Sequence, residues 1–528
     1  MIVPKITNSK LRGKLGLLLP TAGLIGYWPV SNGLVDTIGL SIGELYPLLN
    51  DFLRSIVSSD GGVTRLSDTE IVANIESSVY LNSSLGLVGD ASRGYAFYAD
   101  GTPQTTLDRA KRYLSCTYYG VAYDTTNSNP DVTRTGLIAH HRYLPVQSQM
   151  YACLLNDDGT ENYRLDPADW SKKLDGAASN RDGTDGQVMI KLPEYWFKHE
   201  RIGNTQRWLL SAVAAPGFTR NRPQYISAYE ASLHRPTLKL SSVANLSADY
   251  RGGNNNAEWD AESRTLLGRP VTSISRTSFR TYARNRGAGW EMDNYLAQRT
   301  LLRFCLVEFA TRNSQKAVNA ALVDGLRQGG LGIGVTNING TLWDTFNSYY
   351  PFIPCGQSDS LGSATGDVVY TMPPEYGTLD TYVNRYRGIE MQFGHIWKNM
   401  DGINIRIYAD IEATPVSEAF ITDDPALWND ADYTGFEKIG EVPRTSGYIQ
   451  DLIDGELMPV SNVGAGSATY WCDYEYTSSP ASGESLRTVL LCGTASSGST
   501  AGLGYSTSTT SPSYTSTSIG SRLCYIPA

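Results

Sequence analysis

Residues 275–310 read SRTSFRTYARNRGAGWEMDNYLAQRTLLRFCLVEFA and contain two helical patterns that decide the fold class. In the first pattern, side chains within 279–286 recur at i, i+3, i+4 and i+7, and Gly287 is a helix stop. In the second, Asp293 is the predicted cap of a helix that runs to Ala310. The middle of that helix is apolar nearly all round, which predicts that it is buried.

Short strand patterns surround these two helices. Residues 188–200 (VMIKLPEYWFKHE) alternate in polarity and are interrupted by Pro193, which predicts a strand broken at the proline. The combination predicts the α+β class: a mixed α/β region followed by a domain with many short strands and two main helices. Further predicted strands are 202–213, 224–232, 487–493 and 521–526.

The composition excludes several classes of protein. Of the 528 residues, 41% are hydrophobic and 18% are charged, so the chain has enough apolar material for real cores. The net charge of −9 argues against a nucleic-acid partner, because neutralising phosphates requires clustered Lys and Arg. The seven cysteines form no C-x-x-C pair, so neither a zinc ribbon nor a dithiol site is indicated and free thiols are expected. No cofactor or metal is expected.

The length predicts about three regions. We place an attachment and oligomerisation region at 1–150, the first part of the main domain at 151–432 and its C-terminal part at 433–528. Within the first region, 41–58 is predicted to be a helix, and the apolar stretch 15–30 superficially resembles a signal peptide. That stretch is interrupted by proline and glycines and is too short to span a bilayer, so membrane insertion is not expected.

One segment near the C-terminus has an unusual composition. From Thr494 to Ser518, sixteen of 25 residues are Ser or Thr, and no residue between Arg487 and Arg522 is charged. Because apolar strand patterns flank the segment, we interpret it as loops and strand edges fixed between core strands. Ser, Gly and Tyr are the residues of adaptable binding loops, which makes the segment a candidate binding surface.

Three motifs with chemical potential each have a simpler structural interpretation. Residues 39–43 match the G-x-S-x-G nucleophile pattern, but Ser41-x-x-Glu44 is also a helix capping box. Glu308 could be a general acid with a raised pKa, yet a buried carboxylate is more often a structural acceptor for arginine. Asp423, Asp424 and the Trp-Asn-Asp run at 428–430 offer oxygen ligands for calcium without a second acidic cluster, which is a weak signal.

Two internal stretches and the C-terminal end carry a resemblance to known proteins. Residues 283–322 and 386–405 (YRGIEMQFGHIWKNMDGINI) resemble tail-fibre or adhesin proteins of phages that infect gut bacteria. The ending YWCDYEYT…LRTVLLCG…AGLGYS…SPSY…IGSRLCYI resembles the variable proteins of diversity-generating retroelements. The resemblance covers about 183–526. Within that family, the chain also resembles a trimeric phage receptor-binding protein.

This resemblance implies a C-type-lectin-like fold of the formylglycine-generating-enzyme type, with the variable side chains exposed on one face. In that family, mutagenesis changes template adenines, and Ser, Thr and Tyr codons are reachable from Asn codons in this way. The implied fixed scaffold positions are Gly493, Gly498, Gly502, Gly504, Gly520 and Arg522. The implied variable, receptor-binding positions are Trp471, Asp473, Glu475, Thr494, Ser496, Ser497, Thr500, Ser506, Thr507, Thr509, Thr510, Tyr514, Ser516 and Ser518.

The sequence therefore predicts a non-enzymatic receptor-binding protein of a phage tail. Its expected partners are a bacterial surface receptor (glycan or protein), other tail proteins held through the N-terminal region, and two further copies of itself in a homotrimer. It is expected in the virion after assembly in the host cytoplasm. One alternative is a structural collar or baseplate protein. Another is a glycan-degrading tail enzyme with paired carboxylates drawn from Asp401, Asp410, Glu412, Asp423 and Asp424.

Overall fold

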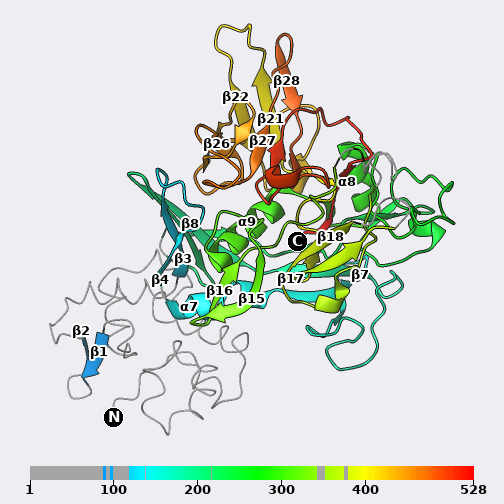
Figure 1. Ribbon diagram of the computed structural model, residues 1–528, viewed down its shortest axis with the longest axis horizontal. Helices are drawn as coiled ribbons and strands as arrows, with labels where there is room; N and C mark the ends of the chain where they lie inside the picture. Colours follow the sequence, from blue (N-terminus) through cyan, green and yellow to red (C-terminus); the bar gives the residue numbers. More distant parts are fainter. Residues whose placement is uncertain are drawn as a thin grey trace.

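The computed structural model of the chain describes residues 87–90, 95–98, 118–136, 138–215, 217–339, 341, 351–373 and 379–527. Within these residues, short strands in open sheets outnumber the helices (Figure 1), so the mixed α+β prediction is confirmed at this level. The predicted helix at 41–58, the G-x-S-x-G motif and the apolar stretch at 15–30 lie outside the described residues. The α-helices among these described residues are α7 (Ile138–Tyr143), α8 (Arg276–Arg284) and α9 (Tyr295–Phe309).

A five-stranded sheet has the order β10-β8-β9-β3-β4. The alternating stretch around Pro193 forms two strands as predicted, because the proline separates the end of one from the start of the next. Val121 pairs with Trp208, so a strand that precedes residue 150 lies in one sheet with strands that follow it. The strands are β3 (Tyr118–Asp124), β4 (Thr133–Gly136), β8 (Tyr195–Ile202), β9 (Thr205–Ser211) and β10 (Thr219–Asn221).

A six-stranded sheet incorporates the end of the chain. Its order is β14-β32-β11-β7-β5-β6, so the last strand pairs on both sides, with Cys524 opposite both Ile226 and Glu291. The C-terminal strand therefore lies inside a sheet whose other members come from residues 151–292. The strands are β5 (Tyr151–Leu155), β6 (Glu161–Arg164), β7 (Gln187–Leu192), β11 (Gln224–Ser227), β14 (Trp290–Met292) and β32 (Leu523–Tyr525).

Helices α8 and α9 lie where the sequence predicts them, with one correction at a cap. The prediction that Asp293 caps α9 is wrong: Asn294 is the N-cap, and its side chain accepts a hydrogen bond from the Ala297 amide. Asp293 instead accepts from the Asn294 amide and from the Gln298 side chain, and burial raises its pKa to about 6. All but one of the residues of α9 are buried, as its apolar circumference predicts.

The C-terminal part of the chain builds two further sheets, which lie at the top of Figure 1. One has the order β24-β27-β30-β29-β20-β31, and the other has the order β23-β22-β21-β28. The first consists of β20 (Trp397–Asn399), β24 (Gly447–Tyr448), β27 (Tyr474–Tyr476), β29 (Leu490–Leu491), β30 (Ser506–Thr507) and β31 (Ile519–Gly520). The second consists of β21 (Ile403–Tyr408), β22 (Ser417–Ile421), β23 (Glu437–Glu441) and β28 (Glu484–Arg487).

A three-stranded sheet and several hairpins complete the fold. The sheet has the order β17-β18-β19 and packs near the end of α9 through Tyr386 and Phe309. Its strands are β17 (Gly366–Thr371), β18 (Asp380–Tyr386) and β19 (Ile389–Glu390). The hairpins are β1 (Leu87–Asp90) with β2 (Tyr95–Tyr98), β12 (Ser232–His234) with β13 (Lys239–Ser241), β15 (Val318–Val323) with β16 (Leu326–Gly329), and β25 (Asp451–Leu452) with β26 (Pro459–Ser461).

The main core is continuous across the predicted region boundaries. One cluster of buried apolar side chains contains Tyr119, which precedes residue 150, together with Phe304 and Trp471. The described residues before 150 therefore contribute to the same core as those after 433. This continuity is what places the C-terminal sheets rigidly against α9.

Candidate functional site

The candidate site is the outward face of the six-stranded sheet formed by β20, β24, β27, β29, β30 and β31. Five aromatic side chains gather there, and we call them the tyrosine face. Their rings form a continuous chain of contacts, with the centroids of Tyr448 and Tyr474 5.0 Å apart, those of Tyr474 and Tyr476 4.8 Å apart and those of Trp397 and Tyr505 4.6 Å apart. The tyrosine face consists of Trp397, Tyr448, Tyr474, Tyr476 and Tyr505.

Strand alternation explains why these tyrosines face outward. In β27, Tyr476 is 43% exposed and Tyr474 is half-buried, whereas Glu475 between them is fully buried. Glu475 pairs with Ser506 on β30, which is also fully buried. The inward row continues through Leu491 to Lys398, because each is the register partner of the last. The sheet therefore has a buried face with Glu475 and a face on which Tyr448, Tyr474 and Tyr476 keep some exposure, while Tyr505, whose ring contacts those of Tyr474 and Tyr476, is only 3% exposed.

Hydroxyl side chains of the Ser/Thr-rich segment border the tyrosine face. The Tyr448 hydroxyl lies 3.1 Å from the Ser499 hydroxyl, in the loop between β29 and β30. On the other side of the face, the Trp397 amide donates to the Ser518 carbonyl at 2.9 Å. Neighbouring hydroxyls pair with each other, as in Thr507 with Thr509 at 3.0 Å. The hydroxyl groups that border the tyrosine face, which we call its rim, are thus uncharged and can both donate and accept hydrogen bonds.

Eight of the predicted variable residues keep partial or full exposure in the loops before and after β30. Ser496 and Tyr514 are exposed, and Tyr514 retains 49% of its exposure. The loop tip that carries Tyr514 lies beyond β30, where Ser516 and Ser518 share a hydroxyl contact of 3.0 Å. The predicted residues that keep partial or full exposure are Ser496, Ser497, Thr500, Thr509, Thr510, Tyr514, Ser516 and Ser518.

The expectation that every predicted variable residue is exposed on one face is wrong for six of them. Three belong to the earlier group: Trp471 packs in the main core, Asp473 is buried just before β27, and Glu475 lies on the buried side of β27. The two-residue period of the strand turns Glu475 inward, whereas Trp471 lies in a turn before the strand, where Cys472 has a φ of +61°. The six buried residues are Trp471, Asp473, Glu475, Thr494, Ser506 and Thr507.

The tyrosines of the face were missed by the sequence reasoning, Tyr505 included. The alternation Trp-Cys-Asp-Tyr-Glu-Tyr at 471–476 separates two sets of side chains. Trp471, Asp473 and Glu475, which the sequence analysis selected, are buried, whereas Tyr474 and Tyr476 keep some exposure. The signal that could have found Tyr474 and Tyr476 is the same alternation, read for the opposite face.

Fixed backbone positions hold the loops around the face. At Gly502, a Cβ atom would lie 1.8 Å from the Asp473 carboxylate. At Gly493, where φ is +76°, a Cβ atom would lie 2.5 Å from the Tyr505 ring. Arg522 is fully buried and donates to the carbonyls of Ser227 at 3.1 Å and Met391 at 2.7 Å. No larger side chain fits at either glycine, so these positions fix the loops around the face.

The two buried carboxyls under the face have few hydrogen-bond donors. Asp473 accepts from the Gly504 amide at 2.7 Å, and burial raises its pKa well above the usual value. Glu475 accepts from the Ser506 hydroxyl at 3.1 Å, and burial raises its pKa to about 8. Among the described residues, its second oxygen has no partner. Burial therefore favours the neutral acid form of Glu475.

We predict that stability falls with rising pH because of Glu475. The folded protein keeps this proton up to about pH 8, whereas the unfolded chain releases it near the usual glutamate pKa of 4.5. The stabilisation is therefore complete below that lower value and is lost as the pH rises toward 8. Between pH 5 and pH 7, Glu475→Gln should gain about 1–2 kcal/mol relative to the wild type. Urea unfolding of both proteins at the two pH values measures this, and parallel pH profiles would refute it.

The carboxylates considered for an enzyme all have structural partners. Both oxygens of buried Asp401 accept from Arg280, at 2.6 and 2.7 Å. Asp424 caps a short helix by accepting from the Ala426 amide at 3.0 Å. The remaining three are held as follows: Asp410 by Arg444 and by Ser479 at 2.9 Å, Glu412 by the Gly483 amide at 3.2 Å, and Asp423 by Arg299 at 3.7 Å.

In the Trp-Asn-Asp run considered for calcium, the carboxylate pairs with two arginines. Asp430 accepts from Arg276 at 2.7 Å and from Arg280 at 2.8 Å. Those two guanidinium groups hold the pKa of Asp430 at about 2 against the opposing effect of burial. Within the described residues, no cluster of His, Cys, Asp and Glu could hold a metal ion. Asp430 thus fixes α8 to the loop after β22.

Comparison with known proteins gives a slight structural likeness. No protein-family model matches the chain, and no curated protein matches it. Among solved structures it is similar to the one named Major Tropism Determinant U1 Variant, with a TM-score of 0.22 and 11% identity. That likeness covers 83% of this chain and 93% of the other. Agreement at this level identifies neither a family nor a function.

Proposed function

We propose that this chain is a receptor-binding protein of a phage tail and that the tyrosine face contacts a bacterial surface receptor. The observation that carries the proposal is the exposure of Tyr448, Tyr474 and Tyr476 on one face of a rigid sheet, bordered by uncharged hydroxyl groups. Tyrosine buries a large area on binding at a low cost in side-chain entropy, and Ser and Thr adapt their hydrogen bonds. This combination suits a binding surface on which the tyrosines stay the same while the bordering Ser and Thr positions are replaced.

The sequence resemblance to variable proteins of diversity-generating retroelements supports the same assignment. Under this proposal the domain is C-type-lectin-like, the glycines at 493 and 502 are fixed, and the rim hydroxyls are the replaceable positions. The replaceable set is then narrower than the sequence alone suggests, because the buried residues are left out. The rim residues are Ser496, Ser497, Ser499, Thr500, Thr509, Thr510, Tyr514, Ser516 and Ser518.

The proposed assembly is a homotrimer in the virion, attached to other tail proteins through the N-terminal region. Three copies of a weak site would raise the apparent affinity by about 10²–10⁴. The proposed partner is a bacterial surface receptor, and the proposal includes neither enzymatic activity nor a nucleic-acid partner. Among the described residues, no helix is long and apolar enough to cross a membrane.

Replacing two anchors of the face tests the proposal. We expect the double variant Tyr448→Ser/Tyr476→Ser to lose host-cell binding by about 30-fold or more, because each exposed tyrosine is a candidate hot spot of about 2 kcal/mol. Binding of purified protein to a panel of host strains measures the loss. Tyr382→Ser, on β18 of another sheet and also half-buried, is the matched control and should leave binding unchanged.

Unchanged host binding by a correctly folded double variant would overturn the proposal. In that case, burial of the same face between subunits in an assembled particle would indicate the structural collar or baseplate protein. Far-ultraviolet circular dichroism and the melting temperature of each variant establish that the fold is retained.

A further inference from the structure

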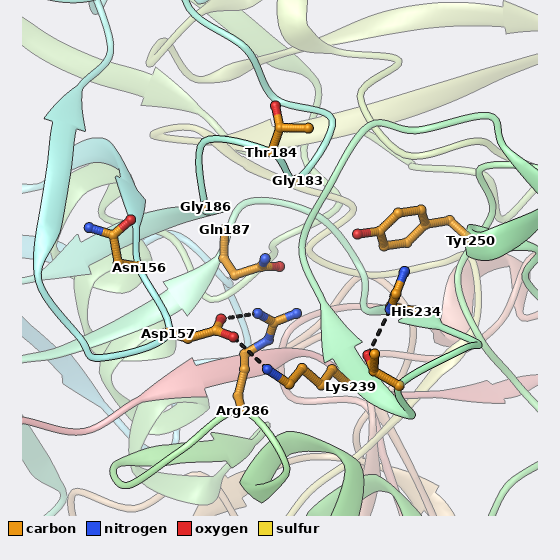
Figure 2. A pocket seen from close by; sticks show the side chains of 11 residues that line it. Asn156, Asp157, Gly183, Thr184, Gly186, Gln187, His234, Lys239, Tyr250 and Arg286 are labelled. Carbon is orange, nitrogen blue, oxygen red and sulfur yellow. Dashed lines mark hydrogen bonds and ion pairs between the residues drawn. The ribbon is translucent and has the colours of Figure 1, made fainter.

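A polar pocket of about 360 Å³ lies in a part of the molecule that the proposed function does not use. It opens between the turn after β5, the turn before β7, the β12–β13 hairpin and the C-terminal end of α8 (Figure 2). These elements belong to other sheets than the tyrosine face. The volume is at the lower end of the range for small-molecule sites, which is enough for a single sugar ring. Its side-chain lining is Asn156, Asp157, Thr184, Gln187, His234, Thr237, Lys239, Tyr250 and Arg286.

Three charged side chains form the floor of the pocket. Asp157 accepts from Lys239 at 2.7 Å and from Arg286 through its other oxygen, as Figure 2 shows. Arg286 is nearly fully buried and is held by the Leu240 carbonyl and the Ser241 hydroxyl, each at 2.7 Å. Among the lining residues, two cations against one carboxylate leave a surplus of one positive charge, while Asp182 and Asp249 act on Tyr250 from outside the lining. The floor therefore favours a ligand with one negative charge.

A buried amide points into the pocket with its donors unused. Gln187 is 3% exposed, and its Oε1 atom accepts from the Ser242 amide at 2.8 Å. Because the Ser242 amide donates, the Gln187 atom that accepts must be its oxygen, and this bond fixes the orientation of an amide group that lines the pocket. No described residue accepts from that nitrogen. An amide that is buried and unpaired on its donor side suits a ligand oxygen.

The opposite wall is aromatic and carries a further hydroxyl. Tyr250 points across the pocket toward Gln187 (Figure 2), and its ring lies 5.1 Å from that of His234. A Cβ atom at Gly183, where φ is +101°, would come within 2.8 Å of the Tyr250 hydroxyl, so glycine keeps this space open. A ring beside hydroxyl and amide groups matches a sugar, which presents C–H groups on one face and hydroxyls at its edge.

The walls are held rigidly before any ligand arrives. In one turn, the Asp182 carboxylate accepts from the Thr184 amide at 2.9 Å and from the Thr184 hydroxyl at 2.8 Å. In the facing turn, Asn156 donates to the Thr160 hydroxyl at 3.0 Å, and the Asp157 carbonyl accepts from the Trp290 indole at 2.8 Å. A site that is already ordered loses less entropy when it binds a small ligand.

We propose that this pocket binds one acidic sugar residue. The carboxylate of the sugar lies against Lys239 and Arg286, its hydroxyls are bound by Gln187, Asn156 and Tyr250, and its ring lies beside Tyr250. This assignment is independent of the tyrosine face, and it gives the chain a second, fixed binding site for saccharide beside the variable one.

Ligand-observed saturation-transfer NMR on the full chain tests the proposal. The probes are glucuronate, galacturonate and N-acetylneuraminate. Glucose is the control for a neutral sugar, and acetate is the control for a carboxylate without a sugar ring. We expect at least one acidic sugar to bind at about millimolar concentration, and glucose and acetate to bind at least about tenfold more weakly. If none of the three acidic sugars binds at about 10 mM, or if glucose or acetate binds equally well, the proposal is overturned.

Two conservative variants locate the binding. Lys239→Met should weaken it by about tenfold, and Tyr250→Phe by about three- to tenfold, because each removes one polar contact. Lys172→Met is the matched control, since Lys172 forms a similar pair with Asp169 at 2.9 Å outside the pocket. Equal binding by wild type, Lys239→Met and Tyr250→Phe would overturn the site. The tyrosine-face variant Tyr448→Ser/Tyr476→Ser should bind the sugar normally, which separates this result from the host-binding test.

Discussion

Replacing Arg387 with methionine is expected to lower the free energy of unfolding by about 3–5 kcal/mol, because it leaves a buried carboxylate without its main partner. Glu308 is 1% exposed and lies inside α9. Arg387 holds both of its oxygens, at 2.7 and 2.9 Å, and the Tyr386 hydroxyl donates to one of them at 2.9 Å. The pair therefore ties α9 to the end of β18. Urea or thermal unfolding measures the loss.

A neighbouring arginine provides the matched control. Arg327 also approaches Glu308, but at 3.5 Å and with 43% of its side chain exposed. Solvent screens such a pair, so Arg327→Met should cost no more than about 1 kcal/mol. In the double variant Glu308→Gln/Arg387→Met, part of the lost stability should return because the unpaired charge is gone. Equal losses for Arg387→Met and Arg327→Met would contradict this account of Glu308.

The second large effect is expected at Trp471. Trp471→Ala should lower the free energy of unfolding by about 3–5 kcal/mol, since it removes a large side chain from a filled core. The indole is 1% exposed, and its ring lies 5.9 Å from that of Trp208 and 6.2 Å from that of Tyr123. These three aromatic residues join the C-terminal part of the chain to the five-stranded sheet. Chemical denaturation of wild type and variant measures the effect.

The same variant separates a core residue from a binding residue. At temperatures where it stays folded, Trp471→Ala should keep its host range, whereas Tyr476→Ala should keep its stability to within about 1 kcal/mol and lose binding. Tyr476 is 43% exposed on the outer face of β27, five residues along the chain from Trp471. A changed host range in the Trp471 variant without loss of stability would restore Trp471 to the receptor-binding set.

The pattern of apolar residues was enough to predict the main elements. Helix α8 and helix α9 occupy the predicted stretches because their apolar spacing follows the helical period. Gly287 follows the end of α8, and Pro193 separates β7 from β8, as the sequence predicts. The cap of α9 was misplaced by one residue, since Asp293 and Asn294 are both good capping types and only the backbone geometry distinguishes them. Glu308 was correctly interpreted as a structural acceptor for arginine, although its partner Arg387 is distant in the sequence.

The candidate site was predicted only in part. The uncharged Ser/Thr-rich segment does supply the rim hydroxyls, because its composition marks residues that neither fill a core nor carry charge. The pocket around Gln187 has no local signature, since its lining comes from five separate stretches between 156 and 286. Only folding brings these stretches together, so spacing along the chain gives no signal for the pocket.

The sequence by itself determined the α+β class, the two long helices and the uncharged C-terminal segment, because each depends on the local order of apolar, polar and charged residues. The tertiary structure decided which side chains of that segment can meet a partner. Alternation along β27 puts Glu475 on one face and Tyr474 and Tyr476 on the other, but it does not say which face meets the core. That choice depends on the neighbours: Trp471, before the strand, packs on Trp208, and Glu475 lies opposite buried Ser506. Tyr474 and Tyr476 are therefore left facing solvent.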